Sequence, residues 1–120
     1  MDSLMISTFR NMQNQAIRQR YNEIYAHERA HKSAAGKYAG NIVIEENSQG
    51  IPVGGHVSIQ MPALDPNNPD STIEHANVVM RAAMAPSDPS EQDYRVAASA
   101  QKIKNQAEAL KRQKHIDFYA

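Results

Sequence analysis

The sequence contains no cysteine and no tryptophan, and aromatic residues make up only 6% of its 120 residues. The lack of cysteine excludes disulfides and thiolate metal sites, which leaves histidine, aspartate and glutamate as metal ligands. A core built mainly from alanine, valine, isoleucine and methionine leaves a small domain marginally stable, so a bound metal can contribute to its folding. The length corresponds to a single domain.

An excess of charge of either sign is also missing, because 13 basic residues balance 13 acidic ones. This balance gives no basic surface that would indicate nucleic-acid binding. The first part of the chain lacks the apolar core of a signal peptide, and no run approaches the roughly 20 apolar residues of a membrane span. We therefore expect a soluble protein, cytoplasmic by default, that binds neither nucleic acid nor membrane. Unconventional export and oligomeric state stay open.

The first half of the chain predicts a long helix followed by a β-hairpin. Residues 7–35 contain no proline or glycine and favour one helix, with Gly36 as its C-terminal cap. Residues 41–60 read as two strands joined by the turn sequence "ENSQG". Two adjacent glycines in the second strand, Gly54 and Gly55, indicate a bulge or a close approach of the backbone to another element.

Two further helices are expected over residues 71–84 and 90–114, followed by a tail over 115–120. Each helix begins with a serine followed three residues later by an acidic residue, which is the spacing of a capping box. The resulting order is α-β-β-α-α in one domain of residues 1–120, a mainly helical α+β fold. The last helix carries a narrow apolar stripe suited to packing on another helix, at Val96, Ala100, Ile103, Ala107 and Leu110.

The long helix contains the motif His-Glu-x-x-His, with His27, Glu28 and His31. Residues four apart lie on one helix face about 6 Å apart along the axis, so both imidazoles can bind one ion. In zinc peptidases with this motif the metal lowers the pKa of a bound water to about 7, and the glutamate accepts its proton. The longer metzincin motif requires glycine and histidine where this chain has Ala34 and Lys37, so the sequence does not match that subclass.

Helical periodicity predicts that both histidines face the interior of the protein. At about 100° per residue, Arg29 and Lys32 fall on the far side of the helix from the two imidazoles. Histidines on an interior face need partners, so we expect a metal site rather than two surface histidines. Phe9, Ala16, Ile17, Ile24, Ala34 and Ala35 fall in the same wedge as His27 and His31, which is about 100° wide and has Glu28 on its edge.

A catalytic zinc site usually has three protein ligands, so the third must come from another element. His56 is the leading candidate, because it follows Gly54 and Gly55 on a strand that can approach the helix closely. The competing interpretation of His56 is an exposed histidine on the outer face of the hairpin.

Three other residues are open as the third ligand: His75, Glu74 and Asp93. Glu74 and Asp93 are both also explained as helix-capping residues. Asp93 lies three positions before Val96 and so can face the core, where it could instead orient a zinc-binding histidine.

The chain resembles the SprA-related metalloprotease catalytic domain family of bacteria, from about Tyr21 to Ala109. The resemblance rests on "HERAHKSAAGKYAG", "VGGHVSI" and "RAAMAPSDPSEQDYRVAASA". It implies a zinc metallopeptidase in which His27, Glu28 and His31 match the family's motif. Members of that family tend to carry glutamate after the Gly-Gly pair, where this chain has His56.

Together, the motif and the resemblance predict a zincin-like domain that acts as a zinc metalloendopeptidase on a peptide or protein substrate. We expect Zn²⁺ on His27, His31 and His56, and Glu28 as the general base. The alternative is a non-enzymatic helical interaction module with a structural metal or none, which would bind its partner through the apolar stripe of the last helix.

Overall fold

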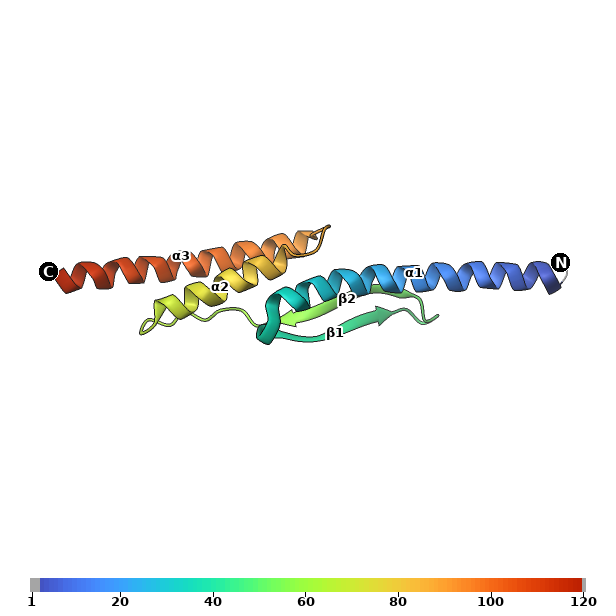
Figure 1. The fold of residues 1–120 in the computed structure, drawn as a ribbon, viewed down its shortest axis with the longest axis horizontal. Coiled ribbons are helices and arrows are strands. Elements are labelled where there is room, and N and C mark those ends of the chain that lie inside the picture. Colours follow the sequence, from blue (N-terminus) through green and yellow to red (C-terminus); the bar gives the residue numbers. More distant parts are fainter. Residues whose placement is uncertain (1–2, 120) are drawn as a thin grey trace.

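The computed structural model describes residues 3–119, and the side chains of residues 3–114. It confirms a mainly helical α+β fold with one antiparallel hairpin, and the molecule is elongated, 87 × 20 × 20 Å (Figure 1). The elements follow one another as helix α1 (Ser3–Ala35), the 3₁₀-helix η1 (Gly36–Tyr38), strands β1 (Ala39–Glu46) and β2 (Pro52–Ile59), and helices α2 (Pro69–Ala83) and α3 (Glu91–Tyr119).

The hairpin packs along the C-terminal half of α1, and the close contact is made at Gly55. A Cβ atom on Gly55 would lie 2.7 Å from Cγ2 of Ile24 and 3.1 Å from the carbonyl oxygen of Val43. A side chain at this position would therefore force the strand away from α1. This is the close backbone approach that the glycine pair indicated.

Helices α2 and α3 lie side by side and form the main core (Figure 1). The core residues are small, which lets the helix backbones approach closely. Two of the five residues in the predicted stripe of α3, Ala100 and Ala107, are fully buried there. The fully buried residues of α2 are Ala76, Val79, Ala82 and Ala83.

Helix α2 begins two residues before the expected Ser71. Pro69 is the first helical residue, and the side chain of Asn68 caps the helix by accepting a hydrogen bond from the Ser71 amide at 3.3 Å. Proline suits this position because the missing amide proton would have no helical partner there. Asn68 therefore provides the side-chain cap.

Helix α3 continues through most of the segment expected as a tail and ends at Tyr119, while residue 120 lies outside the described residues. The sequence of α3 contains no proline or glycine that would end it earlier.

None of the helices within residues 3–119 has an apolar stretch long enough to cross a membrane.

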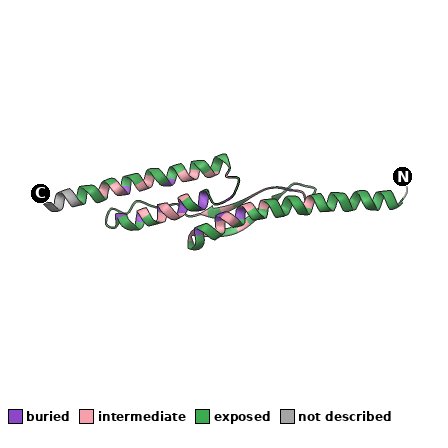
Figure 2. Ribbon diagram, turned by 45° about the horizontal axis from the view of Figure 1, so that its top comes forward, coloured by how far each residue is buried: buried purple, intermediate pink, exposed green. Residues whose placement is uncertain are grey.

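The apolar wedge of α1 is covered along only part of its length (Figure 2). Ile17 and Ile24 are half-buried and Ala35 is buried, whereas Phe9 is 61% exposed and Ala16 is also exposed. The expectation that the whole wedge faces the interior is therefore wrong at Phe9 and Ala16, and also at Ala34 near the C-terminal end, which is exposed. Helical periodicity identifies a face, but it does not say how far a partner element extends along that face.

Candidate metal centre

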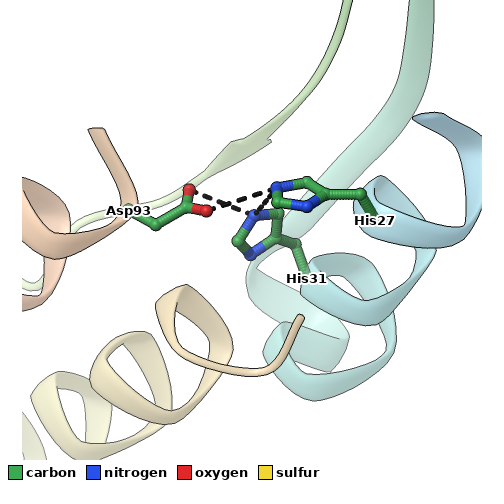
Figure 3. Close-up of side chains that lie close together, drawn as sticks. All are labelled: His27, His31 and Asp93. Carbon is green, nitrogen blue, oxygen red and sulfur yellow. Dashed lines mark hydrogen bonds and ion pairs between the residues drawn. The ribbon is translucent and has the colours of Figure 1, made fainter. Parts of the chain in front are cut away.

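A cleft of about 690 Å³ opens where α1, β2 and the start of α3 meet. His27, Glu28 and His31 reach it from α1, and Asp93 reaches it from the first turn of α3. The two histidines and Asp93 thus come from helices that are distant in the sequence, and their side chains point toward one another (Figure 3).

These three side chains form a compact group. The Nε2 atoms of His27 and His31 lie 3.2 Å apart. Nε2 of His27 lies 3.2 Å from Oδ2 of Asp93, and Nε2 of His31 lies 3.1 Å from Oδ1 of the same carboxylate. The side chains of His27, His31 and Asp93 are 19%, 7% and 13% exposed. One ligand atom from each residue is close enough to the others to hold a single metal ion.

The other ring nitrogen of each histidine is held by a hydrogen bond. Nδ1 of His31 lies 2.7 Å from the carbonyl oxygen of Ala82, which can only accept, so this nitrogen carries a proton. Nδ1 of His27 lies 3.1 Å from a carboxylate oxygen of Asp88, and this hydrogen bond lowers the pKa of the Asp88 carboxyl. An ionised Asp88 also only accepts, so each ring, in its neutral form, presents its Nε2 lone pair to the group.

When both rings are neutral, two Nε2 lone pairs and the Asp93 carboxylate therefore converge on one point. Protons on both Nε2 atoms would satisfy Asp93 but would place two imidazolium rings 3.2 Å apart. A divalent cation can accept an electron pair from each of the three residues at once. Ligands around a tetrahedral zinc, at about 2.0–2.1 Å from the metal, lie about 3.3 Å from one another. The 3.2 Å between the two Nε2 atoms fits this arrangement, and one ligand atom from each of the three residues lies within 4.8 Å of the other two.

Asp93 is held in place by the start of its own helix. Its Oδ2 accepts a hydrogen bond from the Ser90 amide at 2.8 Å, and its amide donates to Oγ of Ser90 at 3.1 Å. This is the reciprocal capping box that the sequence predicted. The capping role and the approach to the histidines occur together, because a cap fixes the carboxylate without using all of its lone pairs.

Glu28 lies beside the group with only 7% of its surface exposed. Burial raises the pKa of its carboxyl above the usual value, His31 and His27 oppose the rise, and Asp93 adds to it. Among the described residues, none forms a hydrogen bond or ion pair with the Glu28 carboxylate, and no fully buried side-chain polar atom there lacks a partner, so its oxygens are open to the cleft that Glu28 lines. Glu28 is therefore a buried carboxylate that is free to exchange a proton with a molecule in the cleft.

His56 lies at the rim of the cleft but outside the three-residue group. Strand alternation turns Gly55 and Val57 toward α1, so His56 faces outward, 53% exposed, with Nδ1 2.9 Å from Oε1 of Glu45. The sequence favoured His56 as the third ligand. In the structure, Asp93, one of the open alternatives, lies with His27 and His31 instead.

The remaining alternatives lie elsewhere. The ring of His75 stacks on Tyr38 at 3.7 Å and its Nε2 donates to the carbonyl oxygen of Gln60 at 2.7 Å, while Glu74 is exposed on α2. Asp88 was missed by sequence reasoning, because an aspartate in a proline-rich loop has no periodicity that reveals which residue it meets.

A family model matches residues 6–117 of the chain, which is nearly its full length, and its description is the SprA-related family. The chain belongs to the SprA-related family. The residues that form the group, and Glu28 beside it, all lie within the matched range. Comparison with curated proteins and with solved structures gave no match.

Proposed function

We propose that the protein is a zinc-dependent metalloendopeptidase whose metal is held by His27, His31 and Asp93. The observation that carries the proposal is the convergence of two Nε2 lone pairs and a carboxylate beside the uncommitted, buried Glu28. Two histidines and one carboxylate form a ligand set found in catalytic zinc sites, which leave one coordination position open to the substrate side. The cleft supplies that open side.

Each residue of the site has a distinct task. Asp88 and the Ala82 carbonyl hold the two rings by Nδ1, which keeps Nε2 available and fixes the direction of each ring. A zinc ion bound there would act as a Lewis acid on the scissile carbonyl and on the attacking water. Glu28 accepts the proton of that water and passes it to the leaving amine.

The hairpin offers a place for the substrate chain. The sheet has two strands, and β2 lines the cleft beside the metal group while pairing with β1 on its other side. An extended peptide can add to the free edge of β2 through backbone hydrogen bonds. This mode favours a polypeptide substrate over a small amide.

A non-enzymatic module with a structural metal is the competing function. A structural zinc site is closed by four protein ligands. The group here has three such residues within the described part of the chain, and it opens on a cleft. The uncommitted Glu28 has no role in a structural site, so these features support catalysis.

The test combines metal content with peptide hydrolysis by the purified protein. We expect about one zinc per chain, loss of metal binding in Asp93→Asn, and retained binding in His56→Gln. Glu28→Gln should keep the metal and lower kcat by a factor of about 10²–10⁴, the usual contribution of a general acid–base group. Glu74→Gln, an equivalent change at an exposed site, is the matched control and should leave kcat unchanged.

Two results would contradict the proposal. The first is a protein that takes up no divalent metal after metal is added back. The second is zinc-loaded Glu28→Gln that hydrolyses peptides as fast as the unchanged protein.

A further inference from the structure

Arg20 is the one arginine or lysine among the described residues that line the cleft. The other charged side chains there are acidic: Glu23, Glu28, Asp88 and Asp93. A zinc ion would offset the charges of Glu28 and Asp93, but Glu23 and Asp88 still disfavour a negatively charged substrate group in the rest of the cleft. Near Arg20, it meets a guanidinium that can form two parallel hydrogen bonds with a carboxylate.

Within residues 3–114, Arg20 has no hydrogen-bond or ion-pair partner. The acidic residue one turn along the same helix, Glu23, accepts a hydrogen bond from Gln19 at 3.4 Å and does not pair with Arg20. Other exposed basic side chains do pair with acidic neighbours, as Lys111 does with Asp70 at 2.8 Å. The guanidinium of Arg20 thus keeps its full donor capacity on the side of the cleft.

The position of Arg20 relative to the metal group sets a distance along the substrate. Arg20 and His27 are seven residues apart, which is close to two helical turns, so they share one face of α1 and lie about 10.5 Å apart along its axis. An extended peptide advances about 3.3 Å per residue. A chain that lies along β2 with its scissile bond at the metal group therefore places its third residue from that bond beside Arg20.

We propose that Arg20 forms a subsite for a carboxylate carried by the substrate about three residues from the scissile bond. The carboxylate belongs either to an acidic side chain or to the free C-terminus of the peptide. This inference rests on the proposed peptidase function and adds its substrate class. The cleft selects chains with one negative charge at this position and with neutral or basic residues elsewhere.

The experiment compares cleavage of matched peptides by the zinc-loaded protein. One peptide set carries Glu, Gln or Lys at the third position on either side of the bond. A second set ends at that position with a free acid or an amide. The protein variants are Arg20→Gln and Arg20→Glu. Arg18→Glu is the matched control, because Arg18 has the same charge on the same helix but does not line the cleft.

We expect the unchanged protein to prefer Glu over Gln at one position, or the free acid over the amide, by about tenfold in kcat/KM. The peptide set that shows the preference identifies the source of the carboxylate. Arg20→Gln should remove the preference and Arg20→Glu should reverse it in favour of Lys. Arg18→Glu should leave it intact, and all variants should keep their zinc content and helical circular dichroism.

Equal cleavage of the Glu, Gln, free-acid and amide peptides would overturn the subsite, as would a preference that persists in Arg20→Gln. A loss in Arg18→Glu as large as in Arg20→Glu would replace it with a long-range charge effect. In these cases cleavage continues and the proposed peptidase function stands. Failure of the unchanged protein to cleave any peptide would instead overturn both proposals.

Discussion

The two halves of α1 continue the same helical pattern, but they differ in how far other elements cover them. In the C-terminal half, Glu28 and His31 are 7% and 5% exposed and line a cleft. In the N-terminal half, Leu4, Phe9 and Met12 are 76%, 61% and 62% exposed. The comparison teaches that an apolar stripe on a helix becomes a core or a site only where another element reaches it.

The lengths of the elements explain the difference. The 33 residues of α1 extend about 50 Å at 1.5 Å per residue. The eight-residue strands extend about 26 Å at 3.3 Å per residue, so the hairpin can cover about half of the helix. The uncovered half depends on its own helical propensity, which gives little stability to a helix in water.

The largest expected effect on stability comes from the contact that holds the hairpin on α1. Gly55→Ala introduces a methyl group that meets Ile24 and the Val43 carbonyl oxygen, so it should lower the free energy of unfolding by about 1–3 kcal/mol. It should also weaken zinc binding, because the same methyl group would lie 3.2 Å from Cγ of Glu28. Urea denaturation and zinc titration measure both effects.

Gly54→Ala is the control for that experiment. The nearest atom to a Cβ at Gly54 is Oε2 of Glu45 at 3.8 Å, which is an ordinary contact. An equal loss of stability in both variants would show that the effect arises from glycine flexibility rather than from the approach to α1.

The next effect contrasts the packed core directly with the uncovered half of α1. Val79 is fully buried, so Val79→Ala should lower the free energy of unfolding by about 2 kcal/mol through lost burial and a cavity. Phe9→Ala removes a larger side chain, yet it should change stability by less than about 0.5 kcal/mol, because Phe9 is 61% exposed. Thermal and urea unfolding of the two variants make the comparison. A cost at Phe9 as large as that at Val79 would mean that the N-terminal half is covered in solution.

The smallest effect concerns the charge of Glu28 in the metal-free protein. Because burial raises the pKa of Glu28 above its ordinary value of 4.5, the folded state binds the proton more tightly than the unfolded state. The ionised carboxylate therefore destabilises the fold increasingly as pH rises from 4.5 through the raised pKa. Glu28→Gln should raise the melting temperature of the metal-free protein near neutral pH, and less so in acid.

The exposed Glu74→Gln variant should show no such dependence on pH. A lower melting temperature of metal-free Glu28→Gln at neutral pH would mean that the Glu28 charge stabilises the site, opposite to the direction given by its burial.

Local patterns in the sequence predicted much of this molecule. The long helix, the hairpin, the capping pair Ser90 and Asp93 and the tight approach at Gly55 follow from spacing between neighbouring residues. Periodicity could not place His56, because the direction of a strand residue depends on which face of the hairpin covers the helix. Asp88 could not be found at all, since a loop carries no repeating pattern.

The sequence by itself determined that His27, Glu28 and His31 share one turn of a helix and can act on one ion, because helical geometry fixes the direction of residues four apart. Only the tertiary structure decided that Asp93 joins the two histidines, that Asp88 and Ala82 orient their rings, and that Arg20 lines the same cleft. The reason is that these residues come from segments more than fifty residues apart or from different walls of the cleft. Whether such residues meet depends on how far the hairpin and α3 extend along α1.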